Sequence, residues 1–194
     1  MFIAIYGPDG VGKSTLIENI TKNTKDLGYE NIDLYHFKPG FLPYSAQITK
    51  DPSHSVIGGR PYGKSPYSSL VIVLKIFYYL IDYFLLHIKI FTKNKKKLII
   101  FDRYYFDLII DAKRARINKF FGFIKFCYIF IPKPDLEIYL VGKPSEIRFR
   151  KPELLENEID ELVIKYKSFG SKYGHVIDTT DLNSNDVYEL VKNI

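Results

Sequence analysis

The segment from Phe2 to Thr15 constrains this chain more than any other part of it. A short apolar run from Phe2 to Tyr6 is followed by Gly-Pro-Asp-Gly-Val-Gly-Lys-Ser-Thr, and an apolar helical pattern begins directly afterwards. This stretch meets the pattern G-x-x-x-x-G-K-[ST] at Gly7, Gly12, Lys13 and Ser14. Strand, glycine-rich turn and helix in this order predict a phosphate-binding P-loop.

The residue types of this loop explain how it would hold a nucleoside triphosphate. Glycines let successive backbone N–H groups turn toward an anion, and a helix beginning near Lys13 adds its positive N-terminal end. Lys13 would reach the β- and γ-phosphates, and the Ser14 hydroxyl would ligate Mg²⁺. The sequence therefore predicts ATP and Mg²⁺ as cofactors. The predicted nucleotide contacts are Gly7, Asp9, Gly10, Val11, Gly12, Lys13, Ser14 and Thr15.

The length and charge of the chain fit one domain that handles anions. With 194 residues, a net charge of +6 and a pI near 9.1, the chain is long enough for a single well-buried domain over 1–194. Nucleic-acid binding is another common reason for such a charge. However, much of the excess lies in Lys93 and 95–97, just before an apolar strand, where a lysine run usually marks a solvated loop. We therefore expect a small-molecule substrate and no nucleic-acid partner.

The cysteine and histidine content points to a reducing compartment and no metal site built from side chains alone. Cys127 is the single cysteine and lies in an apolar aromatic stretch, where a buried structural thiol is expected. The four histidines show no metal-ligand spacing. An N-terminal strand does not read as a signal peptide, so the expected location is the cytoplasm.

Strands alternate with helices along the chain. Strands are expected at 2–6, about 32–37, 98–101, 136–141 and 175–178. Helices are expected at about 13–27, from the start signals at 65–69 to about 91, and at 105–116, 118–130, 145–150, 152–170 and after 183. This order predicts an α/β fold of the P-loop NTPase type, with three layers and a central, mostly parallel five-stranded sheet flanked by helices. The stretch 40–66 is expected to be a functional loop or disordered.

The apolar stretch from Leu70 to Phe91 is long enough for a membrane span. Asp82 would lie near the bilayer centre, at a cost of roughly 2.5–3.5 kcal/mol. Polar residues recur every seven positions at Ser68, Lys75, Asp82 and Lys89, so one narrow stripe of the helix is polar. This pattern favours a helix buried against the sheet and against a second subunit in a homodimer. Contact with a membrane surface is the alternative, and the aromatic segment 120–131 raises the same question.

The Asp102–Arg103 pair follows a short apolar strand. P-loop proteins place a carboxylate that helps hold Mg²⁺ at such a strand end, so Asp102 is the predicted second metal ligand. Arg103 would project at the carboxyl end of the sheet, where its planar fork could hold two phosphate oxygens. The predicted catalytic residues are Lys13, Asp102 and Arg103. A structural Asp–Arg pair that closes the strand is the alternative.

These motifs resemble the thymidylate kinases and their relatives, P-loop kinases of nucleoside monophosphates. The resemblance rests on the acidic P-loop, on Asp102-Arg103-Tyr104, on Pro134-Asp135-Leu136 before a strand, and on the arginine-bearing segment after it. The order of elements is similar over nearly the whole chain. The resemblance implies ATP-dependent phosphoryl transfer, in nucleotide biosynthesis, to thymidylate or a related acceptor.

The resemblance also implies roles for single residues. Asp9 would face the sugar of the acceptor, and Arg103 would contact the acceptor phosphate or the transferred group. A lid over about 143–153 would close over ATP, with contributions from Arg148, Arg150 and Lys151. Lys38 follows the second strand, where the family has Arg-Glu-Pro-Gly, and would contact the acceptor phosphate. The acceptor-binding residues so implied are Asp9, Lys38, Arg103, Tyr104, Asp107 and Asp111.

The sequence departs from the family at the acceptor. The long helix offers no arginine over 78–82, where bacterial thymidylate kinases hold the acceptor phosphate. Asp107 and Asp111 share a helix face and would suit a ligand with hydrogen-bond donors. An equally good interpretation is that their charges complement the dipole at the helix N-terminus.

The residue pattern that follows Asp102 also resembles thymidylate-kinase-like proteins of bacterial polysaccharide gene clusters. The alternatives are a kinase for a sugar, a sugar phosphate or another metabolite, and a nucleotide-gated binding protein at a membrane surface or nucleic acid.

Overall fold

A computed structural model describes residues 1–43, 62–91 and 96–194. The chain divides into two compact units, which are described separately below. The first unit comprises Met1–Phe37, Asn94–Tyr104 and Pro134–Ile194. The second comprises Lys38–Lys93 and Tyr105–Lys133. The single kinase domain expected over 1–194 stays a prediction. The expectations for His54, Lys93, Lys95 and most of the loop at 40–66 lie outside the described residues.

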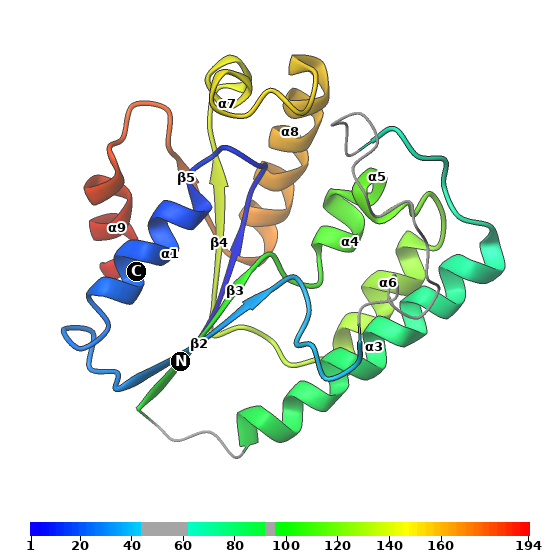
Figure 1. Cartoon of the computed structure of the whole chain (residues 1–194), viewed down its shortest axis with the longest axis horizontal. Coiled ribbons are helices and arrows are strands. Elements are labelled where there is room, and N and C mark those ends of the chain that lie inside the picture. The colour runs from blue at the N-terminus through cyan, green and yellow to red at the C-terminus, as the bar shows by residue number, and fades with distance from the viewer. Residues whose placement is uncertain (44–61, 92–95) are drawn as a thin grey trace. The chain divides into compact units, whose positions relative to one another are not determined.

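The first unit is built on a parallel sheet of five strands in the order β2-β3-β1-β4-β5 (Figure 1). The strands are β1 (Phe2–Tyr6), β2 (Asn31–His36), β3 (Lys97–Asp102), β4 (Leu136–Val141) and β5 (His175–Asp178). Every residue of β1 and β4 is buried, as expected for strands covered on both faces. The predicted strands are confirmed to within one residue at each end.

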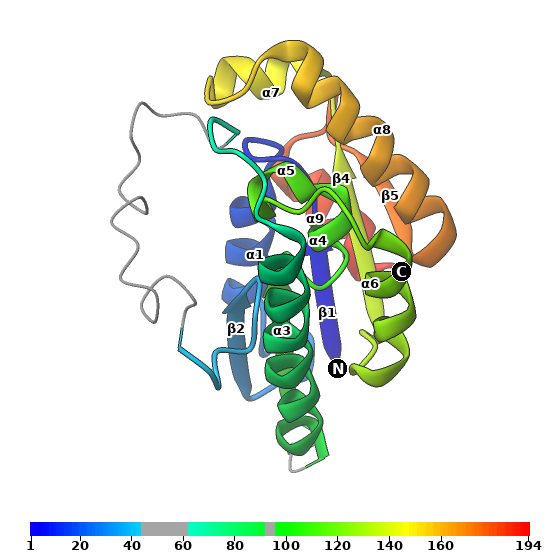
Figure 2. The ribbon, with the colours of Figure 1, turned by 90° about the vertical axis from the view of Figure 1, so that its right-hand side faces the viewer.

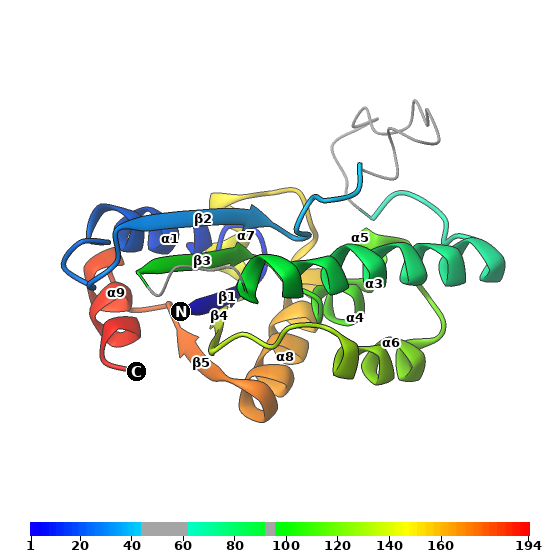
Figure 3. The same cartoon turned by 90° about the horizontal axis from the view of Figure 1, so that it is seen from below.

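Helices cover both faces of this sheet. The helices of the first unit are α1 (Lys13–Lys22), α7 (Pro144–Arg150), α8 (Glu156–Tyr173) and α9 (Ser184–Lys192). Figures 1 and 3 show α1 and α9 on one side of the sheet and α8 on the other. The predicted three-layer α/β fold with a parallel five-stranded sheet is therefore confirmed.

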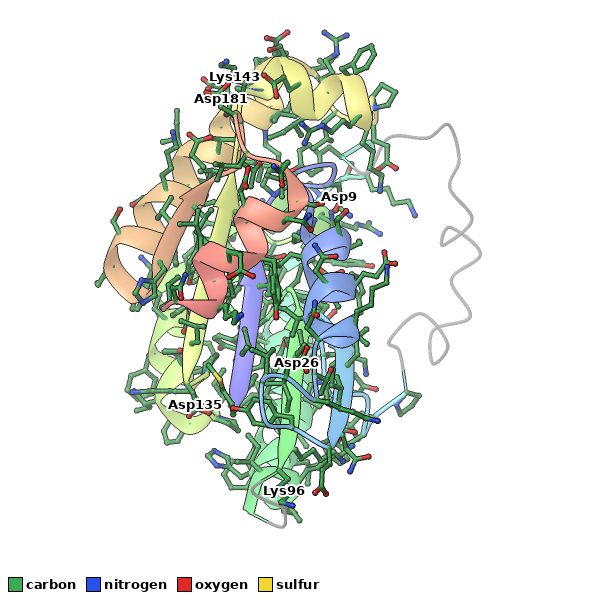
Figure 4. All side chains as sticks on the ribbon, turned by 90° about the vertical axis from the view of Figure 1, so that its left-hand side faces the viewer. Asp9, Asp26, Lys96, Asp135, Lys143 and Asp181 are labelled. Carbon is green, nitrogen blue, oxygen red and sulfur yellow. The ribbon has the colours of Figure 1, made fainter. Side chains whose placement is uncertain are left out.

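The parallel strands place the functional loops at one edge of the sheet. The P-loop follows β1. Asp102 is the last residue of the neighbouring β3 and is in register with Ile5, and Arg103 comes directly after the strand. Asp135 lies at the opposite edge, where its carboxylate accepts a hydrogen bond from the Phe2 amide at 2.6 Å (Figure 4). Asp135 thus anchors the start of β1.

The second unit is helical and packs around aromatic rings. Its helices are α3 (Ser69–Phe91), α4 (Asp107–Ile110), α5 (Ala112–Ala115) and α6 (Phe121–Cys127), with a 3₁₀ turn η2 (Tyr128–Phe130) (Figure 2). Tyr83 of α3 meets Tyr105 edge to face at 5.4 Å between ring centroids. The Tyr105 hydroxyl donates to the Ile124 carbonyl at 2.8 Å, so this buried ring keeps its hydrogen bond.

Four predicted helices differ from the structure. The helix expected at 152–170 is α8, which begins at Glu156 and ends at Tyr173. The other three differ for local reasons. The helix at 13–27 ends at Lys22, because Asn23 and Thr24 bond back to carbonyls of the preceding turn. The helix at 105–116 is two short helices that meet at Asp111. The helix at 118–130 begins only after Phe120, whose positive φ of 64° interrupts the helical backbone.

The apolar helix α3 carries a buried ion pair. The side chains of Asp82 and Lys38 are 0% and 1% exposed, and their charged atoms lie 3.3 Å apart. Asp82 also accepts hydrogen bonds from the amides of Gly40 and Leu42, at 3.1 and 2.8 Å. Lys38 donates to the carbonyls of Leu42 and Pro43, at 2.5 and 3.1 Å. The pair therefore fixes the segment 38–43 against α3.

Within the described residues, one helix is long and apolar enough to cross a membrane, namely the stretch Ser69–Ile90 of α3. Length and composition alone carry little weight, because the core helix of a soluble protein passes the same test.

We predict that Asp82→Asn lowers the free energy of unfolding by about 3–5 kcal/mol, because it leaves the buried Lys38 charge without its counter-ion. Denaturant unfolding followed by circular dichroism measures this loss. Asp160→Asn, on the exposed face of α8, is the matched control and should leave the midpoint unchanged. A loss below about 1 kcal/mol for Asp82→Asn, typical of surface pairs, would contradict the structural role of the pair.

Candidate active site

The P-loop has the tight backbone that its glycines predict. Gly7 directly follows β1, and a Cβ at this position would lie 2.6 Å from the Leu140 carbonyl oxygen. Gly10 has a φ of +90°, and a Cβ there would lie 3.0 Å from the Ile147 carbonyl oxygen. Neither position accepts a larger residue without a shift of the backbone. The loop ends at Lys13, where α1 begins.

Lys13 lies over the P-loop and is buried. Its ammonium group donates to the carbonyl oxygens of Gly7 and Pro8, both at 2.9 Å, and lies 3.6 Å from the Asp9 carboxylate. The loop's own oxygens thus hold the lysine charge at the P-loop, and its contact with phosphate stays a prediction.

Cationic side chains from three segments of the first unit lie close to the Asp9 carboxylate. Arg103 contacts it at 2.6 Å, and the ammonium groups of Lys13 and Lys151 each lie 3.6 Å away. Figure 4 shows Asp9 on the P-loop, above α1. Lys151 also pairs with Glu153 at 3.3 Å, and Lys13 and Arg103 also attract the Asp102 carboxylate, so these cations are shared among three carboxylates. Three cationic side chains beside the P-loop are nevertheless the kind of group that binds a polyanion when it displaces such partners.

Arg103 is held in place from both sides. Its backbone adopts a φ of 69°, and its amide donates to the Ile5 carbonyl at 2.8 Å. One guanidinium nitrogen donates to Asp9, and another donates to the Tyr166 hydroxyl at 3.2 Å. Tyr166 lies on α8 and is fully buried. Sequence reasoning missed Tyr166, because only the fold brings α8 to the end of β3.

Asp102 is a largely buried carboxylate at the end of β3. One carboxylate oxygen lies 3.2 Å from His36 Nδ1, and the other, Oδ1, is buried without a hydrogen-bond partner among the described residues. Burial raises the pKa of Asp102, but the hydrogen bond with His36 and nearby positive charges outweigh it, so the pKa lies below its ordinary value. Asp102 is therefore ionised at neutral pH.

An open groove of about 540 Å³ joins Asp102 to Ser14. Besides these two residues, the groove is lined by α1 and by Leu34, Tyr35 and His36 of β2. A carboxylate oxygen that needs a partner and a serine hydroxyl are hard oxygen ligands, which Mg²⁺ prefers, with the remaining ligands supplied by water and phosphate. The two residues thus fit the predicted metal. Over residues 1–43, 62–91 and 96–194 there is no cluster of three or more His, Cys, Asp or Glu side chains that could hold a metal ion.

The predicted lid segment reaches the P-loop through Lys151 and Ile147. The backbone of α7 lies against Gly10, and Lys151 directly follows this helix. Arg148 pairs with Glu156 at 3.9 Å, and Arg150 pairs with Glu146 at 3.6 Å. The structure therefore brings Lys151 to Asp9 and holds the two arginines in ion pairs near the lid helix. Nucleotide contact by these arginines stays a prediction.

The remaining predicted acceptor residues lie in distinct surroundings. Tyr104 belongs to the first unit and is fully buried, edge to face against Phe2 and Phe101. In the second unit, Asp111 is buried and accepts hydrogen bonds from Tyr62 at 2.7 Å and Arg114 at 2.9 Å.

Asp107 begins α4 and is also buried, and Lys38 is enclosed by its ion pair with Asp82. Acceptor contact by Lys38, Tyr104, Asp107 and Asp111 stays a prediction.

Comparisons with known proteins support the fold. No protein-family model and no curated protein matches the chain. Among solved structures, thymidylate kinase from Ehrlichia chaffeensis is 19% identical with a TM-score of 0.63, and the match covers 100% of this chain and 96% of that one. Deoxyadenosine kinase from M. mycoides with bound dATP is 22% identical with a TM-score of 0.56, covering 100% and 98%.

A second structure of the M. mycoides enzyme, with the products dCMP and a flexible dCDP, is 21% identical with a TM-score of 0.58, covering 100% and 97%. The chain thus has the fold of these P-loop kinases along its whole length, as the motif resemblance predicted.

Proposed function

We propose that this protein is an ATP-dependent kinase that transfers the γ-phosphoryl group to a nucleoside monophosphate or a nucleoside. The observation that carries the proposal is the convergence of Lys13, Arg103 and Lys151 on the Asp9 carboxylate, beside the P-loop. Phosphoryl transfer needs little more from a protein than such positioning and charge neutralisation.

Each group in the first unit has a role in this proposal. The P-loop amides and Lys13 hold the β- and γ-phosphates, and Lys13 exchanges the carbonyls of Gly7 and Pro8 for phosphate oxygens when ATP binds. Ser14 and Asp102 would hold Mg²⁺, which neutralises charge on the phosphates when bound. Arg103, oriented by Tyr166 and Asp9, stabilises the charge that develops on the transferred group.

The reaction itself is a simple displacement. An acceptor oxygen attacks the γ-phosphorus, the bond from this phosphorus to the β–γ bridging oxygen breaks, and ADP leaves. Where the acceptor is a nucleoside hydroxyl, its proton is released to solvent. In the proposal, Arg148 and Arg150 exchange their lid glutamates for ATP when the lid closes, which excludes water from the transfer. An ATP-dependent reaction and a single buried thiol at Cys127 suit the cytoplasm.

The acceptor class rests on the fold neighbours. By their names, one of them acts on thymidylate and the other on deoxyadenosine. We infer an acceptor of this kind, and Asp9 would face its sugar. Sugars and sugar phosphates are the alternative acceptors, because a buried carboxylate such as Asp107 could accept hydrogen bonds from sugar hydroxyls. The Asp111 carboxylate accepts hydrogen bonds from Tyr62 and Arg114, and Asp107 also has a partner, so both carboxylates would have to exchange contacts to bind such an acceptor.

We predict that Lys13→Ala lowers acceptor-dependent ADP release from Mg-ATP by about 10²–10³-fold, because it removes a charged donor from the transferred phosphates. A coupled assay with thymidylate, uridylate, other nucleoside monophosphates, deoxynucleosides, sugars and sugar phosphates measures this release and identifies the acceptor. Lys165→Ala, at an exposed position of α8, is the control and should retain activity.

Normal turnover by folded Lys13→Ala would contradict the proposal. ATP binding with no turnover on any acceptor would also contradict it, in favour of a nucleotide-gated binding protein.

A further inference from the structure

His36 and Asp102 end neighbouring strands of the sheet. His36 is the last residue of β2, Asp102 is the last residue of β3, and the two strands run parallel with these residues in register. Side chains at paired positions of neighbouring strands point to the same face of a sheet. His36 and Asp102 therefore lie side by side, at the same end of the sheet as the P-loop.

Both the side chain and the backbone of Asp102 are tied to the end of β2. His36 Nδ1 lies 3.2 Å from Oδ2 of the Asp102 carboxylate, and in the tautomer with its proton on Nδ1 the ring donates to this oxygen. The amide of Phe37 donates to the Asp102 carbonyl at 2.9 Å. Phe37 has a φ of 63°, so the extended strand ends at His36.

The two oxygens of the Asp102 carboxylate have different surroundings. Oδ2 contacts His36, whereas Oδ1 is buried and has no hydrogen-bond partner among the described residues. A buried carboxylate oxygen without a partner is costly, so such an atom indicates a ligand that the chain itself does not supply. The pKa of Asp102 lies below its ordinary value, so this oxygen belongs to an ionised carboxylate at neutral pH.

The groove beside α1 places this carboxylate and the histidine at different depths. Ser14, His36 and Asp102 all line the groove. The His36 side chain is 66% exposed and that of Asp102 is 21% exposed, so the carboxylate lies deeper than the ring. The buried oxygen is therefore the one that a hard cation beside Ser14 would meet.

We infer that His36 is a positioning residue, which holds Oδ2 of Asp102 so that Oδ1 meets Mg²⁺. This inference rests on the proposed function, in which Ser14 and Asp102 hold the metal. Without a partner on Oδ2, the carboxylate could rotate about its Cβ–Cγ bond and turn Oδ1 away. Residues that orient a metal ligand in this way typically change metal affinity by about 10–100-fold when they are removed.

The reverse arrangement would make His36 the metal ligand. The ring would then bind the ion through Nε2, with Asp102 holding its other nitrogen. The structure favours the first arrangement, because it is the carboxylate that has a buried oxygen in need of a partner. The choice of metal separates the two arrangements, since imidazole favours Ni²⁺ whereas carboxylate oxygens suit Mg²⁺.

The test measures the thermal shift that ADP causes as a function of Mg²⁺ concentration. His36→Ala should raise the Mg²⁺ concentration for half-maximal effect by about 10-fold or more, while the shift caused by ADP in EDTA stays unchanged. His36→Asn should restore the wild-type value, because its amide nitrogen is attached to Cγ as Nδ1 is. Leu34→Ala is the matched control, because Leu34 lies two residues earlier in β2, lines the same groove and is 55% exposed. This control should behave as the wild type does.

A double-mutant cycle tests whether His36 acts through Asp102. Asp102→Asn alone should raise the required Mg²⁺ concentration at least as much as His36→Ala does, because it removes the charge of the ligand itself. In the Asp102→Asn background, His36→Ala should cause little further change, since coupled residues do not act additively. A second loss as large as the first would show that His36 acts independently and would overturn the inference.

Three other outcomes would also overturn it. One is an unchanged Mg²⁺ dependence in His36→Ala, and another is a loss of ADP binding that is equally large in Mg²⁺ and in EDTA, as a merely structural contact would give. The third is a larger loss with Ni²⁺ than with Mg²⁺, which would make His36 a ligand. A wild type that shows no thermal shift with ADP in either condition would instead contradict the proposed function.

Discussion

The ion pair between Asp9 and Arg103 is the interaction on which the candidate active site depends. It joins the P-loop to the end of β3, and Lys13 and Lys151 lie close to the same carboxylate. In a partly buried site these charges attract one another more strongly than they would in water. In the proposed function, the carboxylate thus keeps three cations together before a phosphate binds, so that little reorganisation would be needed.

A second buried charge organises the other unit. Asp82 lies in an apolar helix, yet it pairs with Lys38 and accepts two backbone hydrogen bonds from the segment after β2. Two residues of the polar stripe, Lys75 and Asp82, contact other parts of the unit, and the large apolar side chains on the opposite side of α3 are exposed. Each unit thus uses one carboxylate to hold segments that are distant in sequence.

The sequence predicted the sheet and the P-loop well because both depend on local signals. Apolar runs bounded by glycine and proline set the strands, and Gly7 and Gly10 occupy positions where another residue would clash. The helix ends were predicted less well, because side-chain contacts decided them. Asn23 and Thr24 end α1, and Asp111 separates α4 from α5 where Tyr62 and Arg114 hold it. The sequence could not predict that Tyr166 and His36 contact Arg103 and Asp102, because only the folded sheet brings these residues together.

In the proposed function, the P-loop and the cations around Asp9 form a nucleotide site. Calorimetric titration of a non-hydrolysable ATP analogue into the wild-type chain tests it most directly, in the presence of Mg²⁺ and again in EDTA. The structure predicts saturation at one analogue per chain, tighter binding with Mg²⁺, and weaker binding at high salt. No heat of binding and no thermal stabilisation at millimolar analogue would contradict the account.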